Sequence, residues 1–567
     1  MTNQTPAVDA IPTAPLPPAT ILGYPRIGPD RELKRAVEAH WRGDLDVDAL
    51  RERAAALRAA TRAHLRELGL TGASAVPADF TYYDQVLQVT TALGALPRRF
   101  ADLRGGAGAP GGRAETDAAA AVDTTDGRPG PGAHPGTSLP GFFTAARGEG
   151  ERAALEMTKW FDSNYHYLVP ELDADTPIDY VPGFGAVDPT DGPVAQVLEA
   201  LRDGEEAPRP VIVGPVTYLL LAKAADGAGT GFRPLDRLRD VLGAYGHLLA
   251  DLWAAGAEWV QLDEPALVSD AWDVPREAVL AALADAYTWI AAITERPRVL
   301  VAGTYGPLGD ALPVLAGTGV EGVALDLVAG EAPTADDLAL LEGKTVVAGV
   351  VSGRNIWRTD LNRAMDVLEQ LRERLPEGTP ITVATSTSLQ HVPHDVERET
   401  AIDPEIRSWL AFADQKVGEV ITLAKGLEQG RDAIAAELSQ DADLRKQRAA
   451  HPGVHRDEVR AAVDAVTDAD RTRAPYGERK AAQDERLGLP ELPTTTIGSF
   501  PQTAEIRKAR AAWRKGEIDD AAYDAAMRAE IASVVALQER LGLDVLVHGE
   551  AERNDMVQYF AELLDGF

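Results

Sequence analysis

The sequence predicts an α/β fold: a (β/α)8 TIM barrel, then a helical connector, then the first part of a second (β/α)8 barrel. Two observations carry this prediction. Eight short apolar or β-branched runs alternate with helical stretches over residues 19–427, as expected for βα units around a parallel sheet. A segment that begins at Glu32 recurs at Glu505, which indicates that the unit opening the first barrel also opens a second one.

The strands expected in the first barrel are short runs separated by stretches with helical periodicity. Eight parallel strands, each followed by a helix, suffice to close such a barrel. The expected strands are Thr20–Tyr24, Asp79–Tyr83, Pro210–Val213, Glu258–Leu262, Arg298–Ala302, Gly322–Leu327, Lys344–Val350 and Pro380–Ala384.

Changes in composition along the chain indicate where the other expected segments begin and end. Residues 1–18 are rich in Pro, Thr and Ala and are expected to form a disordered leader. Residues 105–150 begin with a Gly- and Pro-rich stretch, which predicts a loop inserted into the first barrel. Residues 428–489 are highly charged and helical, which predicts a connector, and residues 490–567 are expected to start a second barrel that is truncated at its C-terminal end.

The internal repeat has an offset of 473 residues. Glu32 to Asp46 reads ELKRAVEAHWRGDLD, and Glu505 to Asp519 reads EIRKARAAWRKGEID. With one gap on each side of the Trp, the two copies share the order Glu, aliphatic, basic, basic, Ala, Trp, Arg, Gly, acid, aliphatic, Asp. In the second copy, expected strands Thr494–Gly498 and Asp544–Val547 are too few to close a barrel, so we expect a fragment or a chain completed by another.

Charge and cysteine content exclude several classes of function. The 567-residue chain carries a net charge of −32, which disfavours nucleic acid and anionic membranes as partners. It has no Cys, which excludes disulfides, thiolate nucleophiles, iron–sulfur clusters and any zinc site that uses sulfur. No signal peptide is evident, and we expect a cytoplasmic protein.

Several polar residues follow expected strands, where barrel enzymes place their catalytic groups. Asp263 and Glu264 could act in acid–base chemistry or could cap a helix and bind Arg side chains, and the sequence leaves both readings open. Arg354 and Asn355 have the same ambiguity. The aromatic patch Glu156–Tyr167 is either a helix with ordinary core aromatics or a wall of the barrel mouth.

Other patterns are weak. Gly343, Lys344 and Thr345 resemble the end of a phosphate loop but precede their strand, which argues against that function. Two histidine pairs have spacings found in metal sites, but neither has an evident third ligand, so solvated loop histidines are the better interpretation. These pairs are His391 with His394 and His451 with His455.

A small basic cluster follows the first expected strand. Arg31, Glu32, Leu33 and Lys34 lie at the predicted mouth, and Lys159 could project toward the same rim. Cations gathered there could bind an anionic tail through charge-assisted hydrogen bonds. A surface helix with mixed charges would have the same sequence.

Six segments, in this order, closely resemble the family of cobalamin-independent methionine synthases, the 5-methyltetrahydropteroyltriglutamate–homocysteine methyltransferases. The resemblance covers all but the leader and the Gly-rich insertion, and it implies two face-to-face (β/α)8 barrels. The segments are ILGYPRIGPDRELKRA, EMTKWFDSNYHYLVPE, VQLDEPAL, VSGRNIWRTDL, LPTTTIGSFPQT and LGLDVLVHGEAERNDMVQYF.

The resemblance also implies a methyltransferase of methionine biosynthesis that acts on 5-methyltetrahydropteroyltri-L-glutamate and L-homocysteine, as a monomer when full length. It implies folate contacts at Arg31, Glu32, Leu33, Lys34 and Lys159, and homocysteine or methionine contacts at Ile497, Gly498, Ser499 and Glu550.

Members of this family use zinc, not cobalamin, and hold it with His, Glu and two Cys in the later part of the second barrel. We expect no metal ligand and no catalytic residue of that set in this chain, which would then be inactive alone. The alternative is a non-catalytic barrel protein that binds the folate tail or has a structural role.

Overall fold

A computed structural model of the chain describes residues 15–103, 138–181, 191–330 and 332–564. The chain divides into two compact units, Met1–Leu444 and Arg445–Phe567. Residues 1–14 of the expected leader and 104–137 of the expected insertion lie outside the described residues. Leu16, which the leader was expected to include, is 4% exposed and packs against Trp259 in the core.

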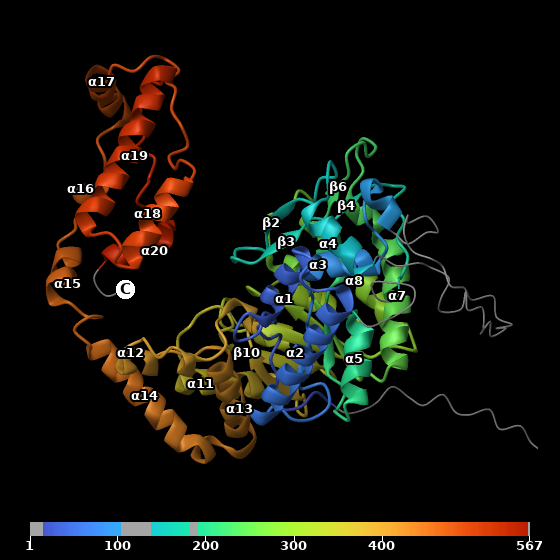
Figure 1. The fold of residues 1–567 in the computed structure, drawn as a ribbon. Helices are drawn as coiled ribbons and strands as arrows, with labels where there is room; N and C mark the ends of the chain where they lie inside the picture. The colour runs from blue at the N-terminus through green and yellow to red at the C-terminus, as the bar shows by residue number, and fades with distance from the viewer. Residues whose placement is uncertain (1–14, 104–137, 182–190, 331, 565–567) are drawn as a thin grey trace, which may run out of the picture. The chain divides into compact units, whose positions relative to one another are not determined.

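Seven parallel strands form the main sheet of the first unit, in the order β1-β5-β7-β8-β9-β10-β11. Figure 1 shows the chain of this unit in colours that begin at blue and pass through green and yellow. Strand order follows chain order, as successive βα units predict. The strands are β1 (Pro77–Ala78), β5 (Arg209–Val213), β7 (Trp259–Asp263), β8 (Arg298–Gly303), β9 (Gly322–Asp326), β10 (Thr345–Val351) and β11 (Ile381–Thr385).

An eighth segment, residues 18–24, joins the two edges of this sheet. On one side, Ala19 forms a parallel bridge to Val383 of β11, and Thr20 N donates to the Val383 carbonyl at 3.0 Å. On the other side, Thr20 Oγ1 donates to the Ala75 carbonyl at 2.7 Å, just before β1. The curled sheet therefore has the eight positions that the sequence predicts, although residues 20–24 make only bridge-like contacts.

Successive side chains along each strand point to opposite faces of the sheet, which divides the core into two layers. In β8, Leu300 and Ala302 point to the barrel interior, where they pack with Trp259, while Val299 and Val301 face the surrounding helices. This alternation gives a packed barrel interior and not a pore. The outer helices include α2 (Val47–Glu67), α5 (Pro193–Arg202), α7 (Leu238–Ala254), α8 (Arg276–Ala291), α11 (Leu361–Arg374) and α13 (Ala413–Gln429).

Two local expectations are wrong. The strand expected at Asp79–Tyr83 lies earlier, at β1, because the Asp79 carboxylate accepts a hydrogen bond from Tyr24 N (2.9 Å) and the chain leaves the sheet there. The aromatic patch Glu156–Tyr167 is not a helix. It contains the antiparallel pair β2 (Met157–Lys159) and β3 (His166–Leu168).

The second unit is helical in its described residues, with α15 (Asp457–Asp464), α16 (Asp468–Arg471), α17 (Tyr476–Leu487), α18 (Ala504–Arg514), α19 (Asp520–Leu541) and α20 (Met556–Leu563). Strands expected at Thr494–Gly498 and Asp544–Val547 are not formed. The extended chain there makes one parallel bridge, Ser499 to Gly549, and Val545 N donates to the Thr494 carbonyl at 3.0 Å.

The internal repeat is present in three dimensions. Helix α1 (Glu32–Trp41) is followed by α2, as α18 is followed by α19. Asp46 accepts from Ala49 N and Asp519 accepts from Ala522 N, both at 2.8 Å, so the N-caps of α2 and α19 recur at the same offset of 473 residues. Side-chain capping at a matched position indicates that the copies share a local fold as well as a sequence.

Candidate functional site

A buried polar relay crosses the interior of the first barrel, from Arg209 at the start of β5 through Gln261 in the middle of β7 to Asp263 at the carboxyl end of β7. Arg209 Nε donates to Gln261 Oε1 at 3.1 Å, and Gln261 Nε2 donates to Asp263 Oδ1 at 2.7 Å. Arg209 and Gln261 are both 0% exposed. The Arg209 guanidinium can only donate, so the amide oxygen of Gln261 must be its acceptor. The NH2 group of the same amide therefore donates to Asp263.

Burial dominates the ionisation of this relay. It raises the pKa of Asp263 to about 7, against the hydrogen bond from Gln261 that favours the charged form. It lowers the pKa of Arg209 to about 10. A carboxyl group that titrates near neutrality at a barrel mouth is typical of functional sites, although structural networks also shift pKa values.

Glu264 has the structural role that the sequence left open. Its carboxylate is 0% exposed and accepts from Val216 N (3.1 Å), Thr217 N (2.6 Å) and the Tyr287 hydroxyl (2.7 Å). Two of these donors are the first N–H groups of helix α6 (Pro215–Leu221), which have no partner within the helix. Glu264 therefore caps α6, and its adjacent carboxylate Asp263 is the one that faces the mouth.

An aromatic cluster covers the same mouth. Trp160 Nε1 donates to the Tyr305 hydroxyl oxygen at 3.0 Å, and the Tyr305 hydroxyl lies 2.8 Å from His391 Nε2. Burial lowers the pKa of His391 to about 4, so the ring that hydrogen-bonds Tyr305 is neutral at pH 7. Phe161 stacks on Tyr305 at 5.8 Å, and the Arg354 guanidinium lies 5.3 Å from the same ring. The patch therefore forms a wall of the barrel mouth.

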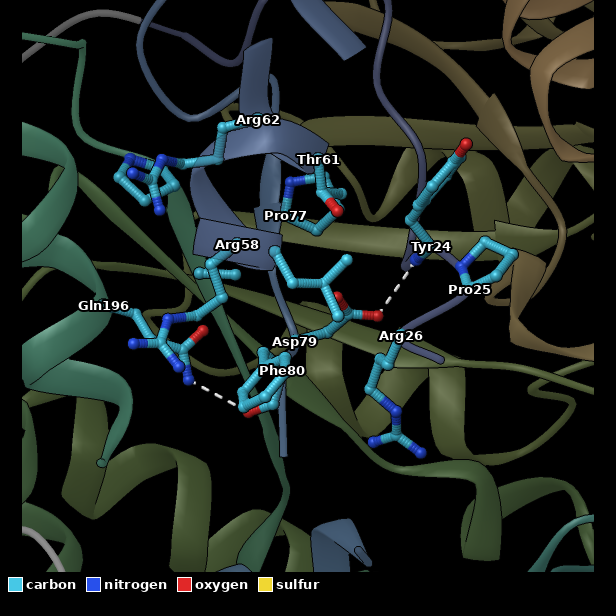
Figure 2. A pocket seen from close by; sticks show the side chains of 13 residues that line it. Tyr24, Pro25, Arg26, Arg58, Thr61, Arg62, Pro77, Asp79, Phe80 and Gln196 are labelled. Carbon is cyan, nitrogen blue, oxygen red and sulfur yellow. Dashed lines mark hydrogen bonds between the residues drawn. The ribbon is translucent and has the colours of Figure 1, made fainter. Parts of the chain in front are cut away.

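Small cavities lie beneath this cluster. One of about 20 Å³ is lined by Asp79, Trp160, Asp263, Tyr305 and Gln390, among others. A second, of about 30 Å³, shares Asp79, Gln85 and Asp263. Figure 2 shows a third cavity, of about 40 Å³, in which Asp79 lies between Tyr24 and Arg26.

The predicted folate residues lie at the start of α1 and on β2. Arg31 precedes α1 with a left-handed backbone (φ 61°), and Arg31, Glu32 and Lys34 are exposed. Lys34 Nζ lies 3.7 Å from Glu38 Oε1, and Glu32 Oε2 accepts from Asp30 N at 3.0 Å. Leu33 differs from the others because its side chain is 8% exposed and packs in the core. Lys159 is exposed on β2.

The predicted homocysteine residues come together in the second unit. Ser499 Oγ donates to Glu550 Oε2 at 2.6 Å, although 51 residues separate the two. Gly498 has φ 131°, which favours glycine, and Ile497 is fully exposed. Glu550 itself has a left-handed backbone (φ 60°). The fold thus joins two of the four residues by a direct hydrogen bond.

Sequence reasoning missed Arg553 in this group. Its Nη2 donates to Ser499 Oγ at 2.8 Å and forms an ion pair with Glu550. The spacing of Glu550 and Arg553 in the sequence could have indicated this contact, because a Glu and an Arg three residues apart can form an ion pair across one turn of the chain.

The remaining candidates have structural surroundings. Arg354 Nη1 lies 3.0 Å from Asp162 Oδ1, and Asn355 Oδ1 accepts from Trp357 N at 3.0 Å. His394 packs edge-on against Tyr24, and His451 Nδ1 accepts from Gly453 N. Lys344 donates to the carbonyls of Thr318 and Val320. None of these arrangements is a phosphate loop or a pair of histidines ready for a metal.

The residues of this chain do not fit a zinc site. The sequence has no Cys, and within the described ranges no three His, Asp or Glu side chains gather in a way that could hold a metal ion. No helix in the described part of the chain is both long enough and apolar enough to cross a membrane.

Comparison with known proteins gives two family matches. Residues 18–109 and 117–376 match the model described as "Cobalamin-independent synthase, N-terminal domain". Residues 492–567 match the model described as "Cobalamin-independent synthase, Catalytic domain".

Curated relatives match almost the whole chain. A 5-methyltetrahydropteroyltriglutamate–homocysteine methyltransferase of Streptomyces coelicolor is 50% identical over 97% of this chain and 65% of the relative. The protein of the same name from Streptomyces avermitilis is 51% identical over 97% of this chain and 65% of the relative. The chain thus spans about 65% of the length of these relatives.

Among solved structures, a putative vitamin-B12-independent methionine synthase from Listeria monocytogenes is 13% identical, with a TM-score of 0.44 over 74% of this chain and 99% of that one.

Proposed function

Because the chain belongs to the cobalamin-independent synthase family, we propose that it is the folate-tail-binding and amino-acid-binding part of a 5-methyltetrahydropteroyltriglutamate–homocysteine methyltransferase. The observation that carries this proposal is the hydrogen bond between Ser499 and Glu550. These residues are far apart in sequence, and the resemblance assigns both to the same ligand.

The chemistry of this pair suits a small amino acid. The Glu550 carboxylate can pair with the ammonium group of homocysteine, and the Ser499 hydroxyl can donate to its carboxylate once it leaves Glu550. Arg553 adds a cation for that carboxylate and forms an ion pair with Glu550 while the site is empty. The backbone at Gly498 permits close approach of the ligand.

The exposed cations of the first unit suit the folate tail. Arg31, Lys34 and Lys159 are exposed in a chain of net charge −32, so a triglutamate tail would be attracted locally and not by the protein as a whole. Leu33 would contribute backbone contacts, since its side chain is buried.

Zinc does not enter the steps proposed for this chain, because its residues do not fit a zinc site. We expect the 567-residue chain to bind no stoichiometric zinc. We also propose that the protein is cytoplasmic and, when full length, monomeric. The acidic net charge supports the proposal that it has no nucleic-acid or anionic-membrane partner.

The test is ligand binding by the chain, measured by calorimetry at low ionic strength. We expect 5-methyltetrahydropteroyltriglutamate to bind more tightly than the monoglutamate, and the K34A/K159A double variant to lose this preference. Lys425→Ala, which removes an exposed cation from α13, is the matched control. Equal affinity for one and three glutamates would contradict the folate assignment.

The amino-acid half is tested with Glu550→Gln. We expect this variant to bind L-homocysteine at least tenfold more weakly, since one charged contact is worth about 1.5–3 kcal/mol. Glu539→Gln on α19 is the control, because Glu539 is an exposed carboxylate of the same unit. Unchanged homocysteine binding by Glu550→Gln would contradict the assignment of Glu550 to this ligand, on which the proposal rests.

A further inference from the structure

The first barrel contains a chamber apart from the residues assigned above to folate and homocysteine. It is the pair of cavities of about 20 and 30 Å³ that share Asp79, Gln85, Val211 and Asp263 as lining residues. By the volume that a buried water needs, each cavity holds a water or a ligand head of a few heavy atoms. This chamber lies at the carboxyl ends of the strands, where barrels bind their ligands.

Hydrogen bonds from neighbouring side chains fix the orientation of the Asp263 carboxylate, as is typical of ligand-binding groups. Gln261 donates to Oδ1 at 2.7 Å, and Arg209 fixes the orientation of that amide. No donor in the described ranges hydrogen-bonds Oδ2, and Asp263 is only partly buried because it faces the cavity. A fully buried Arg–Gln pair that orients one partly accessible carboxylate is a preorganised site.

In the described ranges no cation hydrogen-bonds the Asp263 carboxylate, although the Arg209 charge attracts it from a distance. Asp79 accepts from Tyr24 N and interacts with the nearby Arg26 cation. The Arg209 guanidinium, in contrast, donates to Gln261, Thr20 Oγ1 and the carbonyls of Ser74 and Ile21, and makes no hydrogen bond to Asp263. A carboxylate without a directly bonded cation in a buried site is costly, and a bound cation would relieve that cost.

The roof of the chamber favours an ammonium group over a metal ion. Trp160 and Tyr305 line it, and aromatic faces attract organic cations. The described residues contain no group of three carboxylate or His ligands to surround a metal. Gln85 lines both cavities, and its side-chain amide has an oxygen that can accept from an N–H donor.

We propose that this chamber binds a small ammonium-type cation, either free or as the head of a primary amine, with Asp263 Oδ2 as its anchor. The site belongs to the first barrel and does not depend on the methyltransferase assignment.

The probe is methylammonium chloride, added to the full chain at pH 8 while the melting temperature and binding heat are recorded. Potassium chloride and tetramethylammonium chloride at the same ionic strength are the comparison salts. We expect methylammonium alone to raise the melting temperature, because it has N–H donors and fits the chamber. Equal effects of all three salts would overturn the proposal, as would a response to potassium alone, which indicates a metal-ion site.

Asp263→Asn is expected to abolish the methylammonium response, and Asp270→Asn, at an exposed carboxylate seven residues later, is expected to retain it. A response that survives Asp263→Asn would overturn the proposal.

The wild-type chain provides a test that needs no variant. With a pKa of about 7, Asp263 is mostly ionised at pH 8 and mostly protonated at pH 5, so binding should weaken about a hundredfold. The charged or titratable groups that act on Asp263 are Asp79, Arg209, Glu264, Tyr287 and Tyr305. Equal binding at pH 5 and pH 8 would rule out Asp263 as the anchor.

Discussion

Replacing Glu264 with Ala should destabilise the first barrel, because this carboxylate accepts three buried hydrogen bonds. Two come from the first N–H groups of α6 and one from the Tyr287 hydroxyl. Each orphaned cap donor costs about 1 kcal/mol, and an unsatisfied buried hydroxyl costs about 1–3 kcal/mol. Burial raises the pKa of Glu264, which means that its charged form is costly in this position. Removing the carboxylate removes that cost and offsets part of the loss. We expect a net loss of about 3 kcal/mol.

Urea unfolding followed by tryptophan fluorescence measures this loss, since Trp160 and Trp259 are buried in the first unit. With a slope of about 3 kcal/mol per M, the midpoint should fall by about 1 M. Glu277→Ala, at an exposed carboxylate in the first turn of α8, should leave the midpoint unchanged. A Glu264→Ala midpoint equal to that of Glu277→Ala would refute the capping role.

Two further predictions concern the first unit. Glu199→Ala should cost about 3 kcal/mol because it leaves the buried cations Arg58 and Arg62 without this partner. Burial alone would raise the pKa of Glu199, but hydrogen bonds from both Arg side chains lower it, so its stabilisation is present above the ordinary carboxyl pKa and is lost as pH falls through the lowered value. Urea midpoints at pH 7 and pH 3 should therefore differ less for Glu199→Ala than for wild type, and an equal difference would contradict this. Leu300→Ala should cost about 3 kcal/mol by calorimetry, since Leu300 is 0% exposed inside the barrel, and a loss below about 1 kcal/mol would contradict the packed interior.

The main-sheet strands β5 and β7 to β11 could be predicted within one or two residues, because each is a buried apolar run followed by a turn. The strand expected at Asp79 could not, since its position depends on a hydrogen bond to Tyr24, 55 residues earlier. The patch at Trp160 misled for a similar reason. Its aromatic spacing fits a helix, but the contacts with Tyr305 and the pairing of β2 with β3 hold it in an antiparallel hairpin.

The same limit applies to the sites. Local sequence could place Asp263 and Glu264 at a strand end, but it could not divide their roles, because the donors to Glu264 come from α6 and α8. The resemblance pointed to Ser499 and Glu550 together, while Arg553 became evident only from its contacts with both. Long-range hydrogen bonds are therefore the part that residue patterns do not show.

Closure of the first barrel by residues 18–24 has a consequence for synthesis of the chain. Thr20 N can donate to the Val383 carbonyl only after Val383 has been synthesised, 363 residues later. At about 5–20 residues per second, this segment stays unpaired for about 20 to 70 s. During that interval the side of residues 18–24 that will face β11 is a free edge, and such edges invite pairing with other chains. The nascent barrel is thus most vulnerable to aggregation, and most dependent on chaperones, before β11 has been made.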